Sequence, residues 1–131
     1  MPNDADKIMG RSSLYLLAIL AAALATVIAE EMYSDMFDHI DPDDILPNDE
    51  LRNQYYKCFM DTGPCVTEDQ KYFRQHAAEA FVTKCRRCTE KQKQNVEKIV
   101  VWYTENRPEE WQAMIGKLLE DAKKLNITPA A

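Results

Sequence analysis

The four cysteines of this chain, Cys58, Cys65, Cys85 and Cys88, lie close together in sequence. An even number of cysteines in a short chain indicates two disulfides, and four cysteines allow three pairings. The spacing favours local pairs. The turn sequence from Asp61 to Pro64 can bring its two flanking cysteines together, and the second pair, three positions apart, shares one face of a helix or helix end.

Two other uses of cysteine fit these residues less well. Zinc sites usually combine two close cysteine pairs, and the gap between Cys58 and Cys65 is wide for that purpose. A redox Cys-x-x-Cys motif usually accompanies a βαβ pattern, which this sequence lacks. We therefore expect structural disulfides, no metal site and no cofactor.

The beginning of the chain has the layout of a secretory signal peptide. A polar, partly basic start precedes an almost wholly apolar run over 14–29, and Glu30 follows at once. An uncleaved membrane anchor is the alternative, but this run is shorter than the roughly 20 residues that span a bilayer. Cleavage after Ala29 gives a signal peptide over 1–29 and a secreted domain over 30–131, with no stable membrane insertion.

Length and charge narrow the classes of partner. A chain of 131 residues is enough for one domain, and we expect a monomer. The formal net charge of −6 repels the phosphates of nucleic acids and the anionic heads of lipids. Nucleic acid and membrane-surface partners are therefore not expected.

Helix signals follow one another along the proposed mature chain, and no stretch alternates apolar and polar residues for long enough to indicate a strand. Thr67 with Gln70, and Thr89 with Gln92, have the spacing of a capping box. Pro108 suits the first turn of a helix. We predict an all-α fold of five to six amphipathic helices: a short piece over 42–46, a helix between Asn48 and Asp61, one after Thr67, one after Thr89 and one from Pro108, with the tail from Asp121 extending or restarting a helix.

Apolar stripes at helical spacing run along each of these expected helices. Such stripes pack into a filled core by default, and periodicity does not distinguish a filled core from a lined cavity. Large aromatic side chains and methionine adapt to varied apolar guests, which favours a cavity. The stripes contain Leu51, Tyr55 and Phe59; Phe73, Ala77 and Phe81; Val96, Ile99 and Tyr103; and Trp111, Met114 and Leu118.

Side chains suited to catalysis are scarce. His39 lies among acidic residues, and His76 lies next to an expected core face, so both suit surface or structural roles. Disulfides would leave no free thiol nucleophile. The acidic cluster over 41–44 lacks the pattern of a calcium loop. We therefore predict that the protein is not an enzyme.

Several further motifs accompany the cysteines, which are separated by six, nineteen and two residues. They are the segment Tyr33 to Phe37 followed by Asp38-His-Ile-Asp-x-Asp-Asp-Ile-Leu46; Asn48-Asp-Glu-Leu51 with Tyr55; Gly63-Pro-Cys65; Thr83-x-Cys85-x-x-Cys-Thr-Glu-Lys-Gln92; and Asn106-x-Pro-x-x-Trp111. With this set the chain resembles the insect chemosensory proteins, also called the olfactory-segment D family, over about residues 33–118.

The resemblance implies a compact helical bundle around an apolar channel, with disulfides Cys58–Cys65 and Cys85–Cys88. It also implies a secreted carrier of small hydrophobic ligands, such as fatty-acid-like or alcohol semiochemicals. Some members of the family act instead in development or structure, and a filled core with an external partner site is the alternative. Carried over position by position, the ligand-binding residues are Leu46, Tyr55, Phe73, Phe81, Ile99, Tyr103, Trp111 and Met114.

Three points refine what the resemblance implies. Ala77-Ala78 stands where family members usually carry a larger apolar residue and proline, so we expect a straighter helix and a thinner wall. After Lys117 the aromatic-containing segment of the family is missing, so one wall or mouth should differ. A phenol joins an apolar ring to a hydrogen-bond donor, and we expect Tyr55 or Tyr103 to bond a polar head group.

Overall fold

The computed structural model describes residues 13–17 and 30–131. The chain divides into two units, Met1–Glu31 and Met32–Ala131. Residues 13–17 are helical and belong to the first unit, and the rest of the proposed signal peptide lies outside the described residues. No helix within the described part of the chain is long and apolar enough to cross a membrane.

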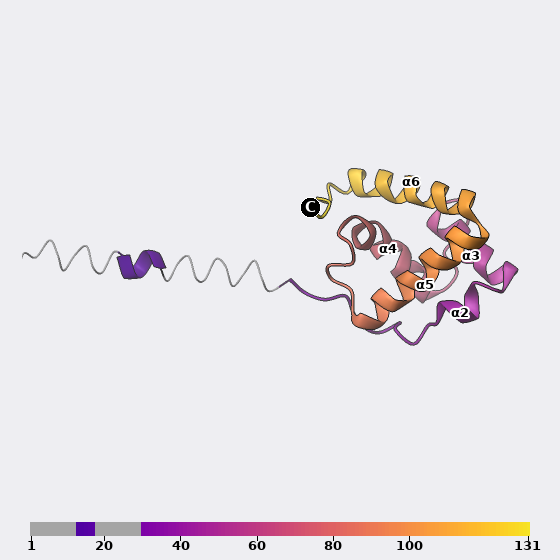
Figure 1. Ribbon diagram of the computed structural model, residues 1–131, viewed down its shortest axis with the longest axis horizontal. Helices are drawn as coiled ribbons and strands as arrows, with labels where there is room; N and C mark the ends of the chain where they lie inside the picture. The colour runs from indigo at the N-terminus through magenta and orange to yellow at the C-terminus, as the bar shows by residue number, and fades with distance from the viewer. Residues whose placement is uncertain (1–12, 18–29) are drawn as a thin grey trace, which may run out of the picture. The chain divides into compact units, whose positions relative to one another are not determined.

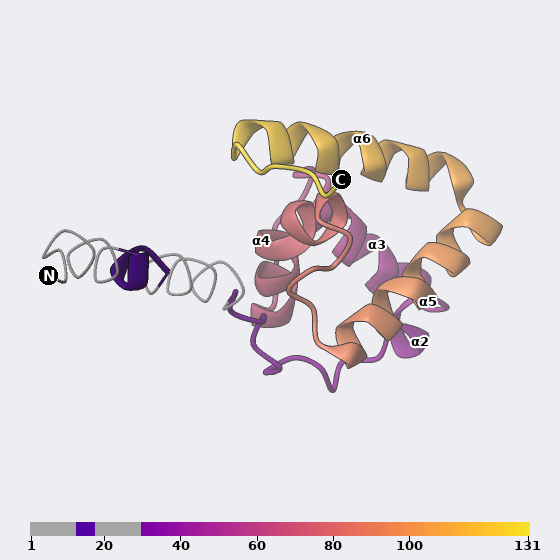
Figure 2. The ribbon, with the colours of Figure 1, turned by 60° about the vertical axis from the view of Figure 1, so that its left-hand side comes forward.

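Helices alone build the second unit, and no strand occurs in residues 32–131. The prediction of an all-α fold is therefore confirmed. Figures 1 and 2 show α6 lying along one side of this unit, with α5 meeting its beginning at a sharp corner. The helices are α2 (Pro42–Ile45), α3 (Asp49–Phe59), α4 (Glu68–Val82), α5 (Glu90–Asn106) and α6 (Pro108–Lys124).

Side-chain caps start three of these helices where the sequence predicts them. Asn48 accepts a hydrogen bond from the Leu51 N–H at 3.1 Å and caps α3. Thr89 caps α5 with a complete capping box, in which Gln92 bonds back to the Thr89 N–H. These caps satisfy N–H groups that have no partner inside the helix.

Only one of the two hydrogen bonds of the capping box predicted at the start of α4 is present. Thr67 accepts a hydrogen bond from the Gln70 N–H at 3.3 Å, as expected of a cap. The Gln70 side chain is completely buried and does not bond back to the Thr67 N–H. Its amide accepts from the Val66 N–H at 2.8 Å and donates to the Gln54 side chain at 2.7 Å.

The helices pack around a shared apolar core. Helix α4 lies against α3 and α6, while α5 lies against α6 and the short α2. Burying a large aliphatic or aromatic side chain contributes roughly 1.5–3 kcal/mol, so these contacts supply much of the stability. The buried core residues are Leu46, Ala78, Val82, Tyr103, Met114, Leu118 and Ala122.

Both predicted disulfides are present. Cys58 is bonded to Cys65 across the turn after α3, and Cys85 is bonded to Cys88 in the loop between α4 and α5. All four sulfurs are therefore used, which excludes the zinc-site alternative for these cysteines. Lys84 and Cys85 both have positive φ angles, 54° and 60°, at the point where the chain leaves α4.

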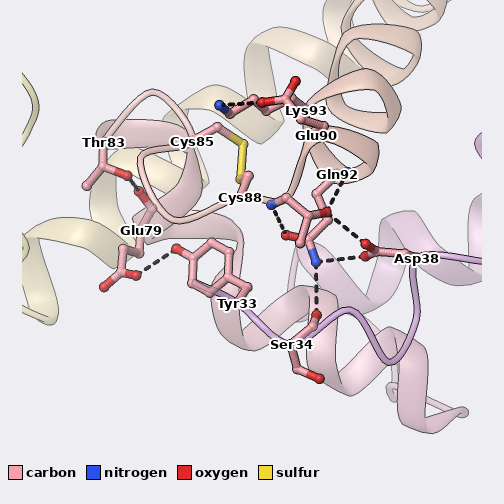
Figure 3. Close-up of a disulfide and its surroundings, with 11 residues drawn as sticks. Tyr33, Ser34, Asp38, Glu79, Thr83, Cys85, Cys88, Glu90, Gln92 and Lys93 are labelled. Carbon is pink, nitrogen blue, oxygen red and sulfur yellow. Dashed lines mark hydrogen bonds and ion pairs between the residues drawn. A yellow bond between two sulfur atoms is a disulfide. The ribbon is translucent and has the colours of Figure 1, made fainter. Parts of the chain in front are cut away.

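Hydrogen bonds hold the segment over 33–38 against α4 and α5, close to the second disulfide (Figure 3). The Tyr33 hydroxyl donates to Glu79 at 2.6 Å. Asp38 accepts from the Thr89 hydroxyl at 2.7 Å and from the Gln92 amide at 2.8 Å. The segment before α2 is thus fixed to two helices that are distant in sequence.

Ion pairs connect α4 and α6 with the turn that follows α3. Asp121 is only 8% exposed, and it lies 2.8 Å from Arg74 and 2.7 Å from Lys117. The same two cations lie 2.9 Å and 2.8 Å from Asp61. Hydrogen bonds from Arg74 and Lys117 hold the pKa of Asp61 well below its usual value. Paired in this way, the buried carboxylate of Asp121 keeps its charge compensated.

The chain beyond Lys117 continues α6 to Lys124. Of the two alternatives expected for the tail from Asp121, an extended or a restarted helix, the structure has the extension. Asn126 then adopts a positive φ of 55°, and the tail turns back towards α4. The Ala130 N–H donates to the Val82 carbonyl at 2.8 Å, and Ile127 packs on the core. The tail therefore covers the end of α4.

Candidate functional site

An apolar cavity of about 410 Å³ lies among the helices. Its volume falls within the range of roughly 300–1,000 Å³ that is usual for small-molecule sites. All eight residues predicted from the resemblance line this cavity: Leu46, Tyr55, Phe73, Phe81, Ile99, Tyr103, Trp111 and Met114.

The two ends of the cavity differ in exposure. Lys84 and Val96 are the exposed lining residues, so the cavity reaches solvent near the loop after α4 and the first half of α5. The lining near the corner between α5 and α6 includes Tyr103 and Met114, which are buried. The lining is therefore most exposed at the side of Lys84 and Val96, which we call the open side, and more deeply buried near the corner between α5 and α6, which we call the closed end.

Helix α4 supplies a wall of unequal thickness. Ala77 and Ala80 line the cavity between the larger rings of Phe73 and Phe81. The neighbouring Ala78 is 2% exposed and belongs to the core instead. Ala77 therefore leaves space in the cavity that a larger side chain at this position would fill.

The sequence predictions missed some of the lining. Tyr56 and Arg52 belong to it, together with Ile40, Pro42, Ile45 and Val100. The burial of Arg52 is contrary to expectation, because a charged residue is seldom buried. Its spacing was the available signal, since position 52 is one helical turn from Tyr55 and Tyr56 and shares their face.

Arg52 is a charged residue that is only 4% exposed and borders the cavity. Its Nη1 donates to the Leu46 carbonyl at 2.7 Å, and its Nη2 donates to Asp49 at 2.7 Å. The guanidinium lies over the Trp102 ring, 4.7 Å from its centre. The Nε atom is buried and has no hydrogen-bond partner among the described residues.

Tyr103 brings a hydroxyl group to the closed end of the cavity. The side chain is 4% exposed and lies between the rings of Trp102 and Trp111, whose centres are 5.2 Å and 6.2 Å away. Burial raises the pKa of Tyr103 to about 12. The phenol is therefore protonated at neutral pH, and within the described part of the chain no hydrogen bond is made by its hydroxyl.

Tyr55 also lines the cavity, but its hydroxyl is already occupied. It donates to a carboxylate oxygen of Asp69 in the first turn of α4. Burial and this hydrogen bond both raise the pKa of Tyr55. Of the two tyrosines, only Tyr103 has a hydroxyl that makes no hydrogen bond to the described residues.

The two histidines and the carboxylates of the acidic cluster are not among the residues that line the cavity. His39 is exposed, and His76 packs between Tyr33 and Tyr72 with ring centres 4.7 Å and 4.6 Å away. Asp41 caps α2 and pairs with Lys98 at 3.0 Å. No group of three or more potential metal ligands occurs in the described part of the chain.

A disulfide-bonded helical bundle with an apolar cavity defines a class of small ligand-binding domains. The sequence profile described as "Insect pheromone-binding family, A10/OS-D" matches residues 33–126. The chain therefore belongs to this insect family, which comprises non-enzymatic ligand-binding proteins.

Individual relatives agree with this assignment. The chain is 38% identical over 102 residues to ejaculatory bulb-specific protein 3 of Drosophila melanogaster, covering 78% of this chain and 80% of the relative. It is 34% identical over 104 residues to allergen Tha p 1 of Thaumetopoea pityocampa, covering 79% and 82%. A solved chemosensory protein in complex with bromo-dodecanol has a TM-score of 0.64 and 29% identity, covering 69% of this chain and 89% of its own.

Proposed function

We propose that this protein is a secreted carrier that reversibly binds small hydrophobic ligands, such as fatty-acid-like or alcohol semiochemicals, in the apolar cavity. The observation that carries the proposal is the apolar space of about 410 Å³ between the helices, where a filled core would leave none. The similar chemosensory protein in complex with bromo-dodecanol supports the same class of ligand.

The burial of a hydrocarbon chain supplies the binding energy. Each methylene transferred from water contributes roughly 0.8 kcal/mol, so a twelve-carbon chain gains about 10 kcal/mol before ordering costs. The loss of translational and conformational freedom removes several kcal/mol of this gain. Affinity in the micromolar range, about −8 kcal/mol, is consistent with what is left.

The eight predicted lining residues would contact the ligand in this proposal. Most of them offer only an apolar surface, while Tyr103 adds a protonated hydroxyl at the closed end. A hydrogen bond from this hydroxyl would orient a ligand with its oxygen towards the corner and its tail towards the mouth.

Displacement of an apolar fluorescent probe by dodecanol tests the carrier function. We expect saturable probe uptake and competition by dodecanol. Replacing Ala77 by leucine places bulk in the cavity, and we expect it to weaken dodecanol binding about tenfold or more. Ala113→Leu, at an exposed position of α6, is the matched control and should leave affinity unchanged. Absence of saturable uptake would reject the proposal in favour of an external partner site.

Secretion is part of the same proposal. The apolar run over 14–29 and the two disulfides both suit an exported protein. Expression of the full chain in insect cells should release a monomer whose first residue is Glu30. N-terminal sequencing and size-exclusion chromatography of the medium check both points, and retention of the intact leader in membranes would contradict them.

A further inference from the structure

We propose that Lys84, at the open side of the cavity, binds the carboxylate of a fatty-acid-like ligand, so that acids and alcohols occupy the cavity in opposite directions. The inference rests on the carrier function proposed above. An alcohol directs its oxygen towards Tyr103 at the closed end, whereas an ionised acid keeps its head group at the open side and directs its tail inwards.

The charged residues of the lining favour this arrangement. Only two charged residues line the cavity among those that the structure describes, and both are basic. Arg52 is buried, and its guanidinium already bonds the Leu46 carbonyl and the Asp49 carboxylate. Lys84 is exposed at the open side. A ligand carboxylate that enters from solvent therefore meets one accessible cation, and no carboxylate of the described lining repels it.

The Lys84 ammonium has hydrogen-bonding capacity for such a ligand. Its Nζ donates to the Ala131 carbonyl at 3.3 Å, a distance at the long end of the range for hydrogen bonds. An ammonium has three donors, and this contact uses one of them. The four-carbon stem is flexible, so Nζ can also reach a carboxylate held at the open side.

The end of α4 fixes the backbone of Lys84 at this place. Lys84 follows Thr83, the C-terminal cap of α4, and has a φ of 54°, a conformation for which glycine is the usual residue. The disulfide Cys85–Cys88 closes the residues that follow into a short loop (Figure 3), and Cys85 also lines the cavity. The turn itself therefore does not call for a lysine, but it holds one at the open side.

The two ends of the cavity suit different head groups because they differ in burial. Tyr103 and Met114 at the closed end are buried, so a carboxylate placed there would lose its hydration at a large cost. At the open side a carboxylate stays in contact with water and pairs with Lys84. An uncharged hydroxyl loses much less on burial, and a hydrogen bond with Tyr103 offsets that loss.

The first test compares dodecanoate with dodecanol at neutral pH, by probe displacement, in three proteins. Lys84→Gln removes the charge and keeps a polar side chain. We expect it to weaken dodecanoate about three- to fivefold, near the upper limit for an exposed ion pair, and to change dodecanol less than about twofold. Lys91→Gln removes the charge of an exposed lysine that does not line the cavity, and it should leave both affinities unchanged.

The second test determines the direction of the bound chain. Bromine quenches tryptophan emission at short range, and the Trp111 ring lies 6.2 Å from that of Tyr103, between ring centres, at the closed end. At saturation, 12-bromododecanoate should quench Trp111 more strongly than 12-bromododecanol, because only the acid brings its brominated tail to the closed end. Trp102→Phe leaves Trp111 as the single tryptophan. The wild type, in which Trp102 does not line the cavity, gives the same comparison.

The outcomes separate this inference from the carrier function. If the wild type takes up neither ligand saturably, the carrier proposal itself fails. If both ligands bind, the role of Lys84 is overturned when Lys84→Gln leaves dodecanoate unchanged or weakens both ligands equally, or when Lys91→Gln weakens dodecanoate as much. Equal quenching by the two brominated ligands, or stronger quenching by the alcohol, overturns the opposite orientations.

Discussion

At the scale of single residues, buried polar side chains determine much of the local structure. Gln70 is fully buried, and its amide satisfies the Val66 N–H and the Gln54 side chain. The sequence correctly placed a cap at Thr67, because a cap is a local feature. It could not place the Gln70 side chain, because the partner Gln54 lies sixteen positions away on another helix.

Replacing Gln70 by alanine should therefore be strongly destabilising. The change leaves the Val66 N–H without its partner and opens a small void, so we expect a loss of about 2–4 kcal/mol in the free energy of unfolding. Urea denaturation followed by circular dichroism measures this loss. Gln75→Ala, at an exposed position of α4, is the matched control. Equal effects of the two substitutions would contradict the role given to Gln70.

The two tryptophans should report differently on ligand binding. Trp111 lines the cavity, whereas Trp102 lies under the guanidinium of Arg52 and is not part of the lining. We expect dodecanol to change the emission of Trp102→Phe, in which Trp111 is the reporter, and to have little effect on Trp111→Phe. Fluorescence titration of both variants checks this, and a larger response in Trp111→Phe would argue for binding elsewhere.

At the scale of helices, the sequence predicts where helices begin, but it does not predict which residues elsewhere in the chain their side chains contact. The caps Asn48 and Thr89 and the proline at position 108 mark helix starts within a few residues, and the structure places α3, α5 and α6 accordingly. Arg52 shows the limit of such reasoning. Its position on the apolar face of α3 follows from spacing, but its burial depends on Trp102 and the Leu46 carbonyl, which belong to other parts of the chain.

The start of α5 offers a test of capping. Thr89 accepts from the Gln92 N–H and donates to Asp38, so its hydroxyl serves both the helix and the segment before α2. Thr89→Ala should lower the free energy of unfolding by about 1–2 kcal/mol. Thr89→Ser keeps the hydroxyl and should cost less than about 0.5 kcal/mol. Similar losses for alanine and serine in urea denaturation would show that the hydroxyl is unimportant.

At the scale of the whole molecule, the presence of a cavity could not be deduced from periodicity. The apolar stripes predicted which side chains face inward, and all eight residues carried over from the family do line the cavity. Whether such side chains meet or stand apart depends on the packing of α4 against α6 and of α5 against both α2 and α6. The contacts of α4 with α6 and of α5 with α2 join segments far apart in sequence, where spacing carries no information.

The ion-pair cluster that joins α4 and α6 predicts how stability depends on pH. Hydrogen bonds from Arg74 and then Lys117 lower the folded pKa of Asp61 from its ordinary 3.8. Its contribution is therefore complete above that value and is lost as the pH falls through the folded pKa. We expect the stability difference between the wild type and Asp61→Asn to shrink below about pH 4.

Urea denaturation across the acid range measures this difference. Asp44→Asn removes an exposed carboxylate that makes no ion pair within the described residues, and it serves as the control. A difference between wild type and Asp61→Asn that stays constant on acidification would show that the ion pairs of Asp61 do not stabilise the fold.

The corner between α5 and α6 determines how affinity depends on the length of a bound ligand. Arg107 alone separates the two helices, so this end of the cavity cannot lengthen. A molecule anchored at the corner must accommodate every additional carbon at the opposite, open side. Affinity along a homologous series of alcohols should therefore rise with each carbon until the tail emerges into bulk water, and then level off. The carbon number at that break gives the depth of the binding site.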